Sequence, residues 1–479
     1  MRRLATALLS LAILATTASV RAETEEGDEA ATAPTIISRD VCILGGGSSG
    51  TYAAVRLKDQ GKTVVVVEPK SQLGGHAETW YLDHDDGGGG GGGYIDYGVE
   101  GVFNNHLSRS YLQRLGVQHK ALLPAATRTD YVDFKTGLKT DHFEPTFLEL
   151  LPAIMLYRLR VGRFDFLRRG LFSDLPDPVP EELLQTFGEF IEKYKFPQYL
   201  LDLVFTFASA VGNLFETPLL YVLQDFGIPH VEALLSGYIT PVKGMYEVYR
   251  RAGEVLGKEN ILFHSKASRV TRNEEEGVTT IVVVDEDGKP VTVRAKQLLV
   301  TFPLTPDNTA PLPLTDSERA LFRKWRWNGY YAAVINNTGI QDGLDVANED
   351  PSKTWGFPLP PFQWRLQWMG VPGHHISKLV ADRDFTPEQA RALMVEDIRR
   401  MAPIYALPQP EVVAFADHSP SVLTVSNDDI RAGFYRDLYA LQGRGGIFYT
   451  GASMCSDYSS LLWAYTDDVI GMMGGNGTV

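Results

Sequence analysis

The sequence predicts an α/β fold, and three observations near its start support this prediction. Residues 40–44 and 62–67 are short apolar runs, which are typical of buried parallel strands. A glycine-rich turn follows the first run, at residues 45–50. Residues 51–60 then have helical character, and Gly61 is suited to end a helix. A strand, a helix and a second strand joined by short turns form a βαβ unit, which indicates a parallel sheet.

The turn carries the spacing of a dinucleotide-binding motif. Gly45, Gly47 and Gly50 satisfy G-x-G-x-x-G, with Ser49 inside the motif. The first glycine permits a tight turn, the second lets a pyrophosphate approach the backbone, and the third lets the helix pack on the strand. Glu68 follows Gly50 by 18 residues, the spacing at which a carboxylate binds a ribose. We therefore expect a Rossmann-like dinucleotide site.

Composition and charge exclude several classes of function. Lys and Arg number 45 against 59 Asp and Glu, so the formal charge is −14 and no general affinity for nucleic acid is expected. Zinc-spaced Cys/His clusters and a P-loop lysine are missing from the sequence. A hydrolase or a kinase is therefore not indicated.

The first residues have the features of an export signal. Arg2 and Arg3 precede an apolar stretch, and Val20 and Ala22 suit a signal-peptidase site. We expect a signal peptide at 1–22 and a flexible leader at 23–35, with an uncleaved membrane anchor as the alternative. The protein is then secreted or enters the lumen of the secretory pathway, and no transmembrane span is expected in the mature chain.

The cysteines and the potential glycosylation sites are compatible with export through the secretory pathway. Only Cys42 and Cys455 are present, so at most one internal disulfide can form. Cys42 falls inside a predicted strand, where a core role is expected. Asn336 and Asn476 begin Asn-x-Ser/Thr tripeptides, which predict a glycoprotein.

Further segments resemble the flavin amine oxidase superfamily. Residues 68–76 run EPKSQLGGH, in which Gly74 and Gly75 match the glycine pair that follows the ribose acid. His76 stands where the superfamily often has Arg, and this Gly-Gly-His variant resembles the fungal beta-cyclopiazonate dehydrogenase family. Residues 96–103 resemble the Asp-x-Gly loop that lines the flavin, after a hairpin at 78–82 and 94–97. Residues 446–452, with Gly451, resemble the strand and turn before the last helix.

The resemblance implies FAD as the cofactor and a discontinuous architecture. The Rossmann-like FAD-binding domain is expected from 36–105, 236–305 and 440–479, with an inserted α+β substrate domain from 106–235 and 306–439. In the middle block, Val270 is expected to contact the adenine through its backbone. That block also predicts a hairpin of 279–284 and 291–295, then a separate buried strand at 298–303.

The same resemblance implies an oxidoreductase. We expect dehydrogenation or oxidative cyclisation of a lipophilic secondary metabolite, by hydride transfer to flavin N5, with O2 as the electron acceptor. A redox-neutral double-bond isomerase of a polyunsaturated chain is the alternative, and a flavin-binding carrier is a third hypothesis. His76 is the catalytic candidate, either as a proton acceptor or as a positioning group near the flavin or the phosphates. Tyr238, Trp364, Trp368 and Tyr458 are either cavity walls or core residues.

Three segments have two interpretations each. Residues 147–157 are apolar and precede five arginines, so they form either a membrane-surface patch or, as we favour, a core-packing helix with a solvated cationic side. The glycines at 87–93 form either a lid or, as we favour, an expanded hairpin tip. Asp467 and Asp468 lie on the predicted last helix, and solvation alone explains them.

Overall fold

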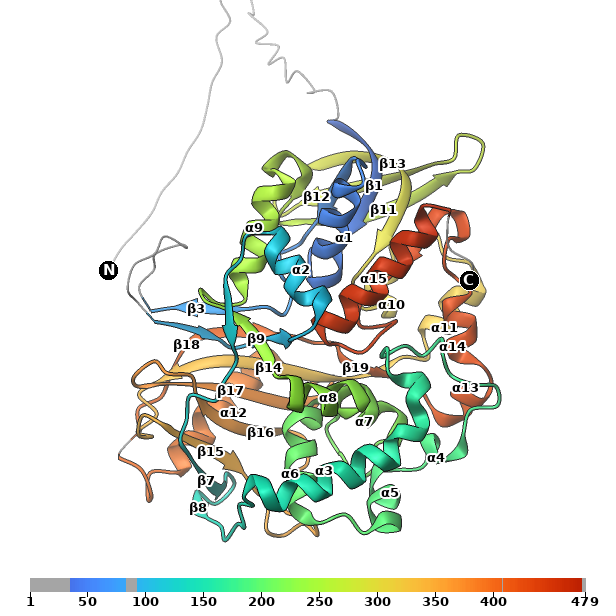
Figure 1. Ribbon diagram of the computed structural model, residues 1–479. Coiled ribbons are helices and arrows are strands. Elements are labelled where there is room, and N and C mark those ends of the chain that lie inside the picture. Colours follow the sequence, from blue (N-terminus) through green and yellow to red (C-terminus); the bar gives the residue numbers. More distant parts are fainter. Residues whose placement is uncertain (1–34, 83–92, 407, 476–479) are drawn as a thin grey trace, which may run out of the picture. The chain divides into compact units, whose positions relative to one another are not determined.

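Two β-sheets organise the chain from Thr35 onward (Figure 1). The computed structural model describes residues 35–82, 93–406 and 408–475. The predicted signal peptide, nearly all of the predicted leader, Asn476 and most of the glycine run at 87–93 lie outside these residues. The structure therefore does not test those predictions.

The first sheet is the predicted dinucleotide-binding sheet. Five of its strands run parallel in the order β10-β2-β1-β13-β20, and β12 and β11 continue it in antiparallel fashion from β13. The strands are β1 (Ile36–Leu44), β2 (Val64–Val67), β10 (Ile261–Leu262), β11 (Ser265–Asn273), β12 (Val278–Asp285), β13 (Pro290–Val300) and β20 (Ile447–Tyr449). All of them come from the three segments predicted for the FAD-binding domain.

One expectation for this sheet is wrong. The hairpin strand at 291–295 and the buried strand at 298–303 are a single strand, β13. Its first half pairs with β12, its last three residues pair with β20, and its other edge pairs with β1 along most of its length. Exposure alternates in the first half, whereas the last three residues are buried. The change from alternating to continuous apolar character therefore marks a change of neighbour, and not a break in the strand.

The second sheet is mixed and comes from the remaining segments. Its order is β18-β14-β17-β16-β15-β7-β8, and β19 also pairs with β14. The strands are β7 (Arg128–Asp133), β8 (Leu138–Lys139), β14 (Arg326–Asn336), β15 (Leu344–Asn348), β16 (Phe362–Trp368), β17 (His374–Asp382), β18 (Glu411–Asp417) and β19 (Ser421–Thr424). The predicted domain boundaries remain a prediction, because residues from Thr35 onward form one compact unit.

Two small sheets join the larger parts. The predicted hairpin is confirmed as β3 (Thr79–Tyr81) paired with β4 (Tyr94–Asp96). A second small sheet has the order β5-β9-β6, and its strands are β5 (Val102–Phe103), β9 (Tyr238–Pro241) and β6 (His119–Ala121).

Helices follow the predicted distribution. Helices α1, α2, α9 and α15 lie around the first sheet, whereas α3 to α8 gather in the lower part of the view (Figure 1). The helices are α1 (Ser48–Asp59), α2 (His106–Arg114), α3 (Phe147–Val161), α4 (Glu181–Leu184), α5 (Phe187–Tyr194), α6 (Gln198–Ala208), α7 (Leu219–Phe226), α8 (Ile228–Ser236), α9 (Tyr246–Leu256), α10 (Pro306–Thr309), α11 (Asp316–Phe322), α12 (Pro387–Arg400), α13 (Asn427–Arg431), α14 (Phe434–Tyr439) and α15 (Ser459–Met473). Residues 145–235 are therefore mainly helical, as expected.

Helix α3 packs into the core, as we favour, and also has an exposed apolar side. Ala153, Ile154, Tyr157 and Val161 are buried, as in a core-packing helix. The opposite side exposes large apolar side chains: Leu148, Met155 and Leu159 are 79%, 50% and 70% exposed. The arginines that follow are largely engaged in ion pairs, with Glu232, Glu182 and Asp468 as their partners. Among the residues that the structure describes, no helix is long and apolar enough to cross a membrane.

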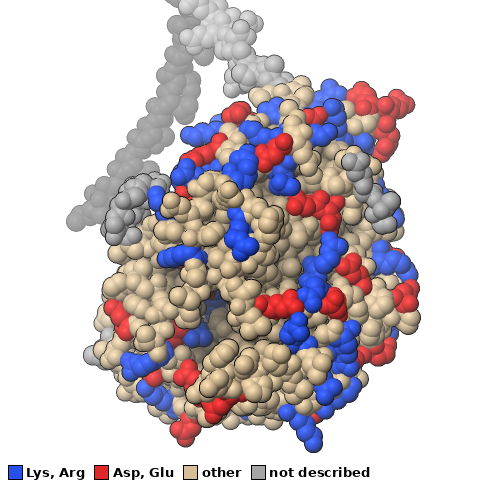
Figure 2. Space-filling view, viewed as in Figure 1, with Lys and Arg blue, Asp and Glu red and all other residues tan. Residues whose placement is uncertain are grey.

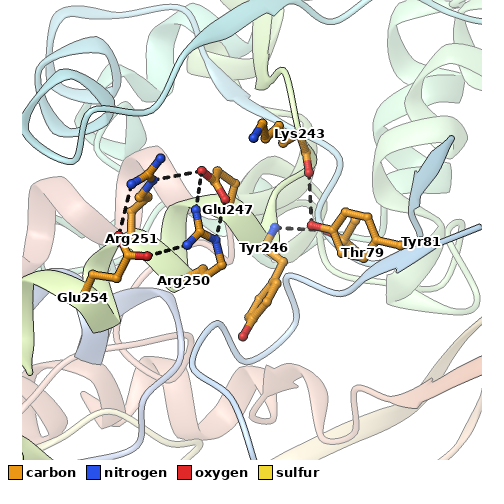
Figure 3. A network of polar contacts seen from close by, with 8 residues as sticks. All are labelled: Thr79, Tyr81, Lys243, Tyr246, Glu247, Arg250, Arg251 and Glu254. Atoms are coloured by element: carbon orange, nitrogen blue, oxygen red, sulfur yellow. Dashed lines mark hydrogen bonds and ion pairs between the residues drawn. The ribbon is translucent and has the colours of Figure 1, made fainter. Parts of the chain in front are cut away.

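A network of polar contacts ties the hairpin β3–β4 to the first turn of α9 (Figure 3). Thr79 Oγ1 accepts a hydrogen bond from the backbone N–H of Tyr246 (3.0 Å) and donates one to Asp96 Oδ1 (2.5 Å). Asp96 Oδ1 also accepts from the Met245 N–H (2.8 Å). Tyr81 adds a hydrogen bond to the carbonyl of Lys243. These hydrogen bonds therefore fix the position of Asp96, where the loop after β4 begins.

Replacing Thr79 tests this attachment. Thr79→Val keeps the shape and removes both hydrogen bonds, so Asp96 and the Tyr246 N–H each lose a partner inside the protein. We expect a loss of roughly 1–3 kcal/mol in the free energy of unfolding, measured by chemical denaturation. Thr280→Val on β12, a half-buried site, is the matched control. Equal effects of the two substitutions would contradict the attachment.

Candidate active site

The two glycine motifs predicted from the sequence lie directly against each other. The Gly74 N–H donates to the Gly46 carbonyl at 2.8 Å. A Cβ atom on Gly75 would lie 3.0 Å from the Gly47 Cα atom, closer than side chains normally approach. Gly74 and Gly75 have φ values of +122° and +61°, which favour glycine. The close approach of the two segments leaves backbone, without side chains, at the start of α1.

Thr301, directly after β13, packs against the other glycines of the site. Its hydroxyl donates to the carbonyls of Leu44 and Gly45, at 3.1 and 3.0 Å. A Cβ atom on Gly45 would lie 2.5 Å from Thr301 Oγ1, and one on Gly451 would lie 2.5 Å from the Thr301 carbonyl. A Cβ atom on Gly50 would lie 1.9 Å from the Gly45 carbonyl. Gly45, Gly50 and Gly451 are therefore required by packing, in addition to any contact with a ligand.

Helices α1 and α15 begin at the same place. Ser48 Oγ lies 3.2 Å from Ser459 Oγ, at the first residues of the two helices. Among the described residues, no N-cap side chain bonds to either N-terminus, and neither first turn contains an acidic residue. Ser49 Oγ is buried there without a hydrogen-bond partner among the residues that the structure describes. Two helix N-termini with free N–H groups make a site for an anion.

The expectation that Asp467 and Asp468 are only solvated is wrong. Asp467 accepts hydrogen bonds from Tyr52 (2.8 Å) and Arg56 (3.1 Å) of α1, and Asp468 pairs with Arg169. The contacts of Asp467 join α1 and α15 about two turns after their N-termini. They therefore keep the two helices side by side, with both positive ends at the site.

Glu68 lies at the carboxyl end of β2, as predicted, and is buried. Its carboxylate accepts from the backbone N–H groups of Gly46 (2.7 Å) and Lys70 (2.9 Å). Burial raises the pKa of Glu68, and these two hydrogen bonds oppose that rise. The carboxylate is thus held beside the glycine turn, where a ribose would follow the pyrophosphate.

The geometry does not favour the predicted role of Val270. The backbone N–H of Ser265 bonds to the Glu68 carbonyl, so the beginning of β11 is the part beside Glu68. Val270 is five residues further, about 16 Å along a strand. Its own N–H donates to the Pro311 carbonyl at 2.9 Å. A residue nearer Ser265 is better placed to meet an adenine attached to a ribose at Glu68.

His76 follows the glycine pair and stacks on His418, which the sequence analysis did not identify. The two ring centroids are 4.4 Å apart with an interplanar angle of 20°, and Asp457 Oδ2 lies 3.8 Å from His76 Nδ1. Burial and the neighbouring His76 hold the pKa of His418 well below its usual range. His418 is therefore neutral, and its ring supports that of His76. The short sequence around His418 contains no motif that indicates this role.

A cavity of about 1520 Å³ opens beside this pair. Three of the four predicted wall residues, Tyr238, Trp364 and Tyr458, line it, whereas Trp368 is not among the lining residues. His76, His418 and Asp457 line the same cavity. The start of α15 and His76, the residue after the glycine pair, therefore border a space large enough for a small molecule.

Helix α7 brings a carboxyl group into this cavity. Asp225 lines it, and burial, with a smaller contribution from the charge of Asp457, raises the pKa of Asp225 to about 8. Near neutral pH the group is therefore largely protonated. Asp225 could not be identified from the sequence, because residues 219–226 resemble an ordinary apolar helix.

The residues of the site fit a dinucleotide. The uncapped N-termini, the unpartnered Ser49 hydroxyl and the bare backbone at Gly47 and Gly75 suit a pyrophosphate, and Glu68 suits a ribose. Charges of both signs are scattered over the face shown in Figure 2, without a continuous basic surface for a polyanion. The fold and the site thus define a dinucleotide-binding enzyme with an adjoining substrate cavity.

Comparisons with known proteins specify the class. The family model described as flavin containing amine oxidoreductase matches residues 48–462. The chain is 42% identical to the beta-cyclopiazonate dehydrogenase of Aspergillus oryzae, over 91% of this chain and 93% of that protein. It is 31% identical to the FAD-dependent oxidoreductase oblC of Cochliobolus heterostrophus, over 90% of each chain. The protein therefore belongs to the flavin-containing amine oxidoreductase family and is an FAD-dependent oxidoreductase.

Solved structures confirm the fold. The structure of a conjugated-linoleic-acid-producing (CLA-producing) fatty acid isomerase from P. acnes matches with a TM-score of 0.69 and 18% identity, over 91% of this chain and 98% of that chain. Wild-type putrescine oxidase bound to putrescine matches with a TM-score of 0.62 and 16% identity, over 91% and 99%. The predicted α/β class is confirmed, with two large sheets in the described part of the chain.

Substitution of Gly75 tests the contact between the glycine motifs. Gly75→Ala combines a strained backbone with a Cβ atom 3.0 Å from Gly47, so the two segments must separate. We expect at least a tenfold loss of FAD affinity, measured by titrating the purified protein with FAD. Gly61→Ala is the control, because Gly61 also has a positive φ (+78°) but has no atom within 4 Å of the added Cβ. Equal FAD affinity of the two variants would contradict the proposed closeness.

The raised pKa of Asp225 predicts that the stability of the protein depends on pH. The native carboxyl keeps its proton up to about pH 8, whereas in the unfolded chain its pKa is near 3.8. Between these values the native state binds more protons, so its stability falls as the pH rises. Asp225→Asn removes this dependence. We expect its melting temperature, relative to the wild type at saturating FAD, to increase from pH 5 to pH 8. A difference that does not change with pH would contradict the protonated carboxyl.

Proposed function

We propose that the protein oxidises a lipophilic small molecule of secondary metabolism, by dehydrogenation or oxidative ring closure. The observation that carries the proposal is the cavity of about 1520 Å³ beside His76 and the start of α15. The aromatic walls suit an apolar substrate. The related enzyme of Aspergillus oryzae is named a beta-cyclopiazonate dehydrogenase, which supports oxidation of a compound of this type.

The geometry of the site supports an assignment of the cofactor contacts. We assign Gly45, Gly47, Ser49 and Gly50 to the pyrophosphate, together with the N-terminus of α1, in a Rossmann-like domain. Glu68 would hold the adenosine ribose. Gly74, Gly75, His76 and Gly451 would lie on the flavin side. FAD bound there supplies a hydride acceptor at flavin N5. The positive end of α15 favours negative charge near the flavin pyrimidine.

The chain's own residues then orient the substrate and exclude water. The imidazoles of the stacked pair, His76 and His418, both line the cavity, and Asp457 lies beside His76. In dehydrogenation the substrate loses a hydride to the flavin and a proton to a base, for which His76 is the candidate. In ring closure, an internal nucleophile of the substrate forms a bond to the carbon that lost the hydride, and releases the proton.

Two further parts of the proposal concern electrons and location. Oxygen would take the two electrons from the reduced cofactor and yield hydrogen peroxide, because the sequence contains only one convincing dinucleotide motif. The signal-like residues 1–22 support a secreted or lumenal protein, and the acceptor tripeptide at Asn336 is compatible with it.

Metabolite analysis tests the proposal. Deleting the encoding gene should make one lipophilic compound accumulate and its oxidised product disappear, as followed by mass spectrometry. The purified holoenzyme is then mixed with that compound without oxygen. Lasting loss of flavin colour, reversed by air with formation of hydrogen peroxide, is expected. Rapid return of the colour without oxygen, with an isomer of equal mass as the product, would instead establish the double-bond isomerase.

Substitution of His76 separates its two candidate roles. His76→Phe keeps an aromatic ring on His418 and removes proton transfer. If His76 is the base, the rate of anaerobic flavin reduction should fall by about 10²–10⁴ while FAD content is unchanged. His119→Phe, at an exposed position, is the control. A variant that reduces the flavin at the wild-type rate would show that His76 acts only by position.

A further inference from the structure

One part of the cavity wall is polar and lacks hydrogen-bond partners within the described part of the chain. Gln224 of α7 lines the cavity and is 7% exposed. Both its amide nitrogen and its amide oxygen are buried without a hydrogen-bond partner among the residues that the structure describes. The next residue, Asp225, also lines the cavity. Its Oδ2 atom is likewise buried without a hydrogen-bond partner among the described residues.

The position of this pair is fixed by the active-site segment. Ser456 donates a hydrogen bond from its hydroxyl to the main-chain carbonyl of Gln224, at 2.6 Å. Ser456 immediately precedes Asp457 and Tyr458, which line the cavity beside His76. The two side chains of α7 are therefore attached to the segment that leads into α15, and they face the space in which a substrate would meet the flavin.

Buried polar groups without partners favour a ligand that can complete their hydrogen bonds. A buried amide without partners is costly, so an occupant or ordered water must complete its hydrogen bonds. The Gln224 amide offers a donor and an acceptor, and a protonated Asp225 offers the same combination. The complementary group is a neutral one that carries an N–H donor next to a carbonyl acceptor, as an amide or a lactam does.

The charges around the cavity disfavour a carboxylate at this position. The two half-buried cations of the wall are neutralised, since Lys378 pairs with Glu100 and Arg365 with Asp345, each at 2.6 Å. Two more lining cations, Lys120 and Lys243, are exposed. The charge of Asp457 acts on Asp225, so a negative group bound at the pair would be repelled by Asp457.

We propose that Gln224 and Asp225 form a subsite that binds a neutral amide or lactam group of the substrate and positions the substrate against the flavin. The proposal rests on the proposed function, because it assigns the substrate class of the same cavity. The two residues are positioning residues. They select a nitrogen-containing neutral substrate over a fatty acid.

Two probes of equal chain length test this selectivity. Octanamide and octanoate are titrated into the FAD-loaded full chain by isothermal titration calorimetry. The wild type should bind octanamide at least tenfold more tightly than octanoate. Gln224→Met keeps the length of the side chain and removes both polar atoms, so it should lower that ratio at least fivefold. Gln113→Leu, at an exposed position on α2, should leave the ratio unchanged.

Variants of Asp225 complete the test. Asp225→Asn retains a donor and an acceptor and should keep the preference for octanamide, whereas Asp225→Leu should lose it. Equal binding of the two probes by the wild type, or an unchanged ratio in Gln224→Met, would overturn the proposal. Failure of the proposed function is recognised separately, by a holoenzyme whose flavin is never reduced by the accumulated metabolite, whichever probe binds.

Discussion

The site depends on main-chain contact between two segments that lack side chains. Gly74 and Gly75 cross the turn at Gly46 and Gly47, with a hydrogen bond of 2.8 Å, and a Cβ atom on Gly75 would lie 3.0 Å from the Gly47 Cα atom. Only glycine tolerates both the positive φ angles and the approach. The contact exposes backbone N–H groups at the start of α1, which is what a pyrophosphate requires. Other features of the site are arranged around this crossing.

Thr301 and the pairing of α1 with α15 connect the crossing to the cavity. Thr301 lies between the turns that follow β1 and β20, so the ends of three neighbouring parallel strands meet at one residue. Asp467 holds α15 against α1, and the N-terminus of α15 then adjoins the cavity that His76 and Tyr458 line. A cofactor bound along this path would run from Glu68 to the substrate, which is the spatial requirement of hydride transfer.

The features that could be predicted from the sequence are those with local causes. The strand, turn and helix at 40–60 and the hairpin β3–β4 follow from hydrophobic period and glycine spacing within a few residues. The continuity of β13 was missed because its pattern changes where its neighbour changes. The stacking of His418 on His76 joins residues far apart in sequence, and Gln224 and Asp225 resemble ordinary positions of an apolar helix. Such groups become recognisable only when the folded chain leaves their polar atoms without partners.

The most direct test of the account is the amount of FAD that the purified full chain retains. If the crossing glycines and the two helix N-termini form the cofactor site, the protein should elute from gel filtration with about one FAD per chain and with the absorption spectrum of a bound flavin. Correctly folded protein that remains colourless after incubation with excess FAD would contradict the account.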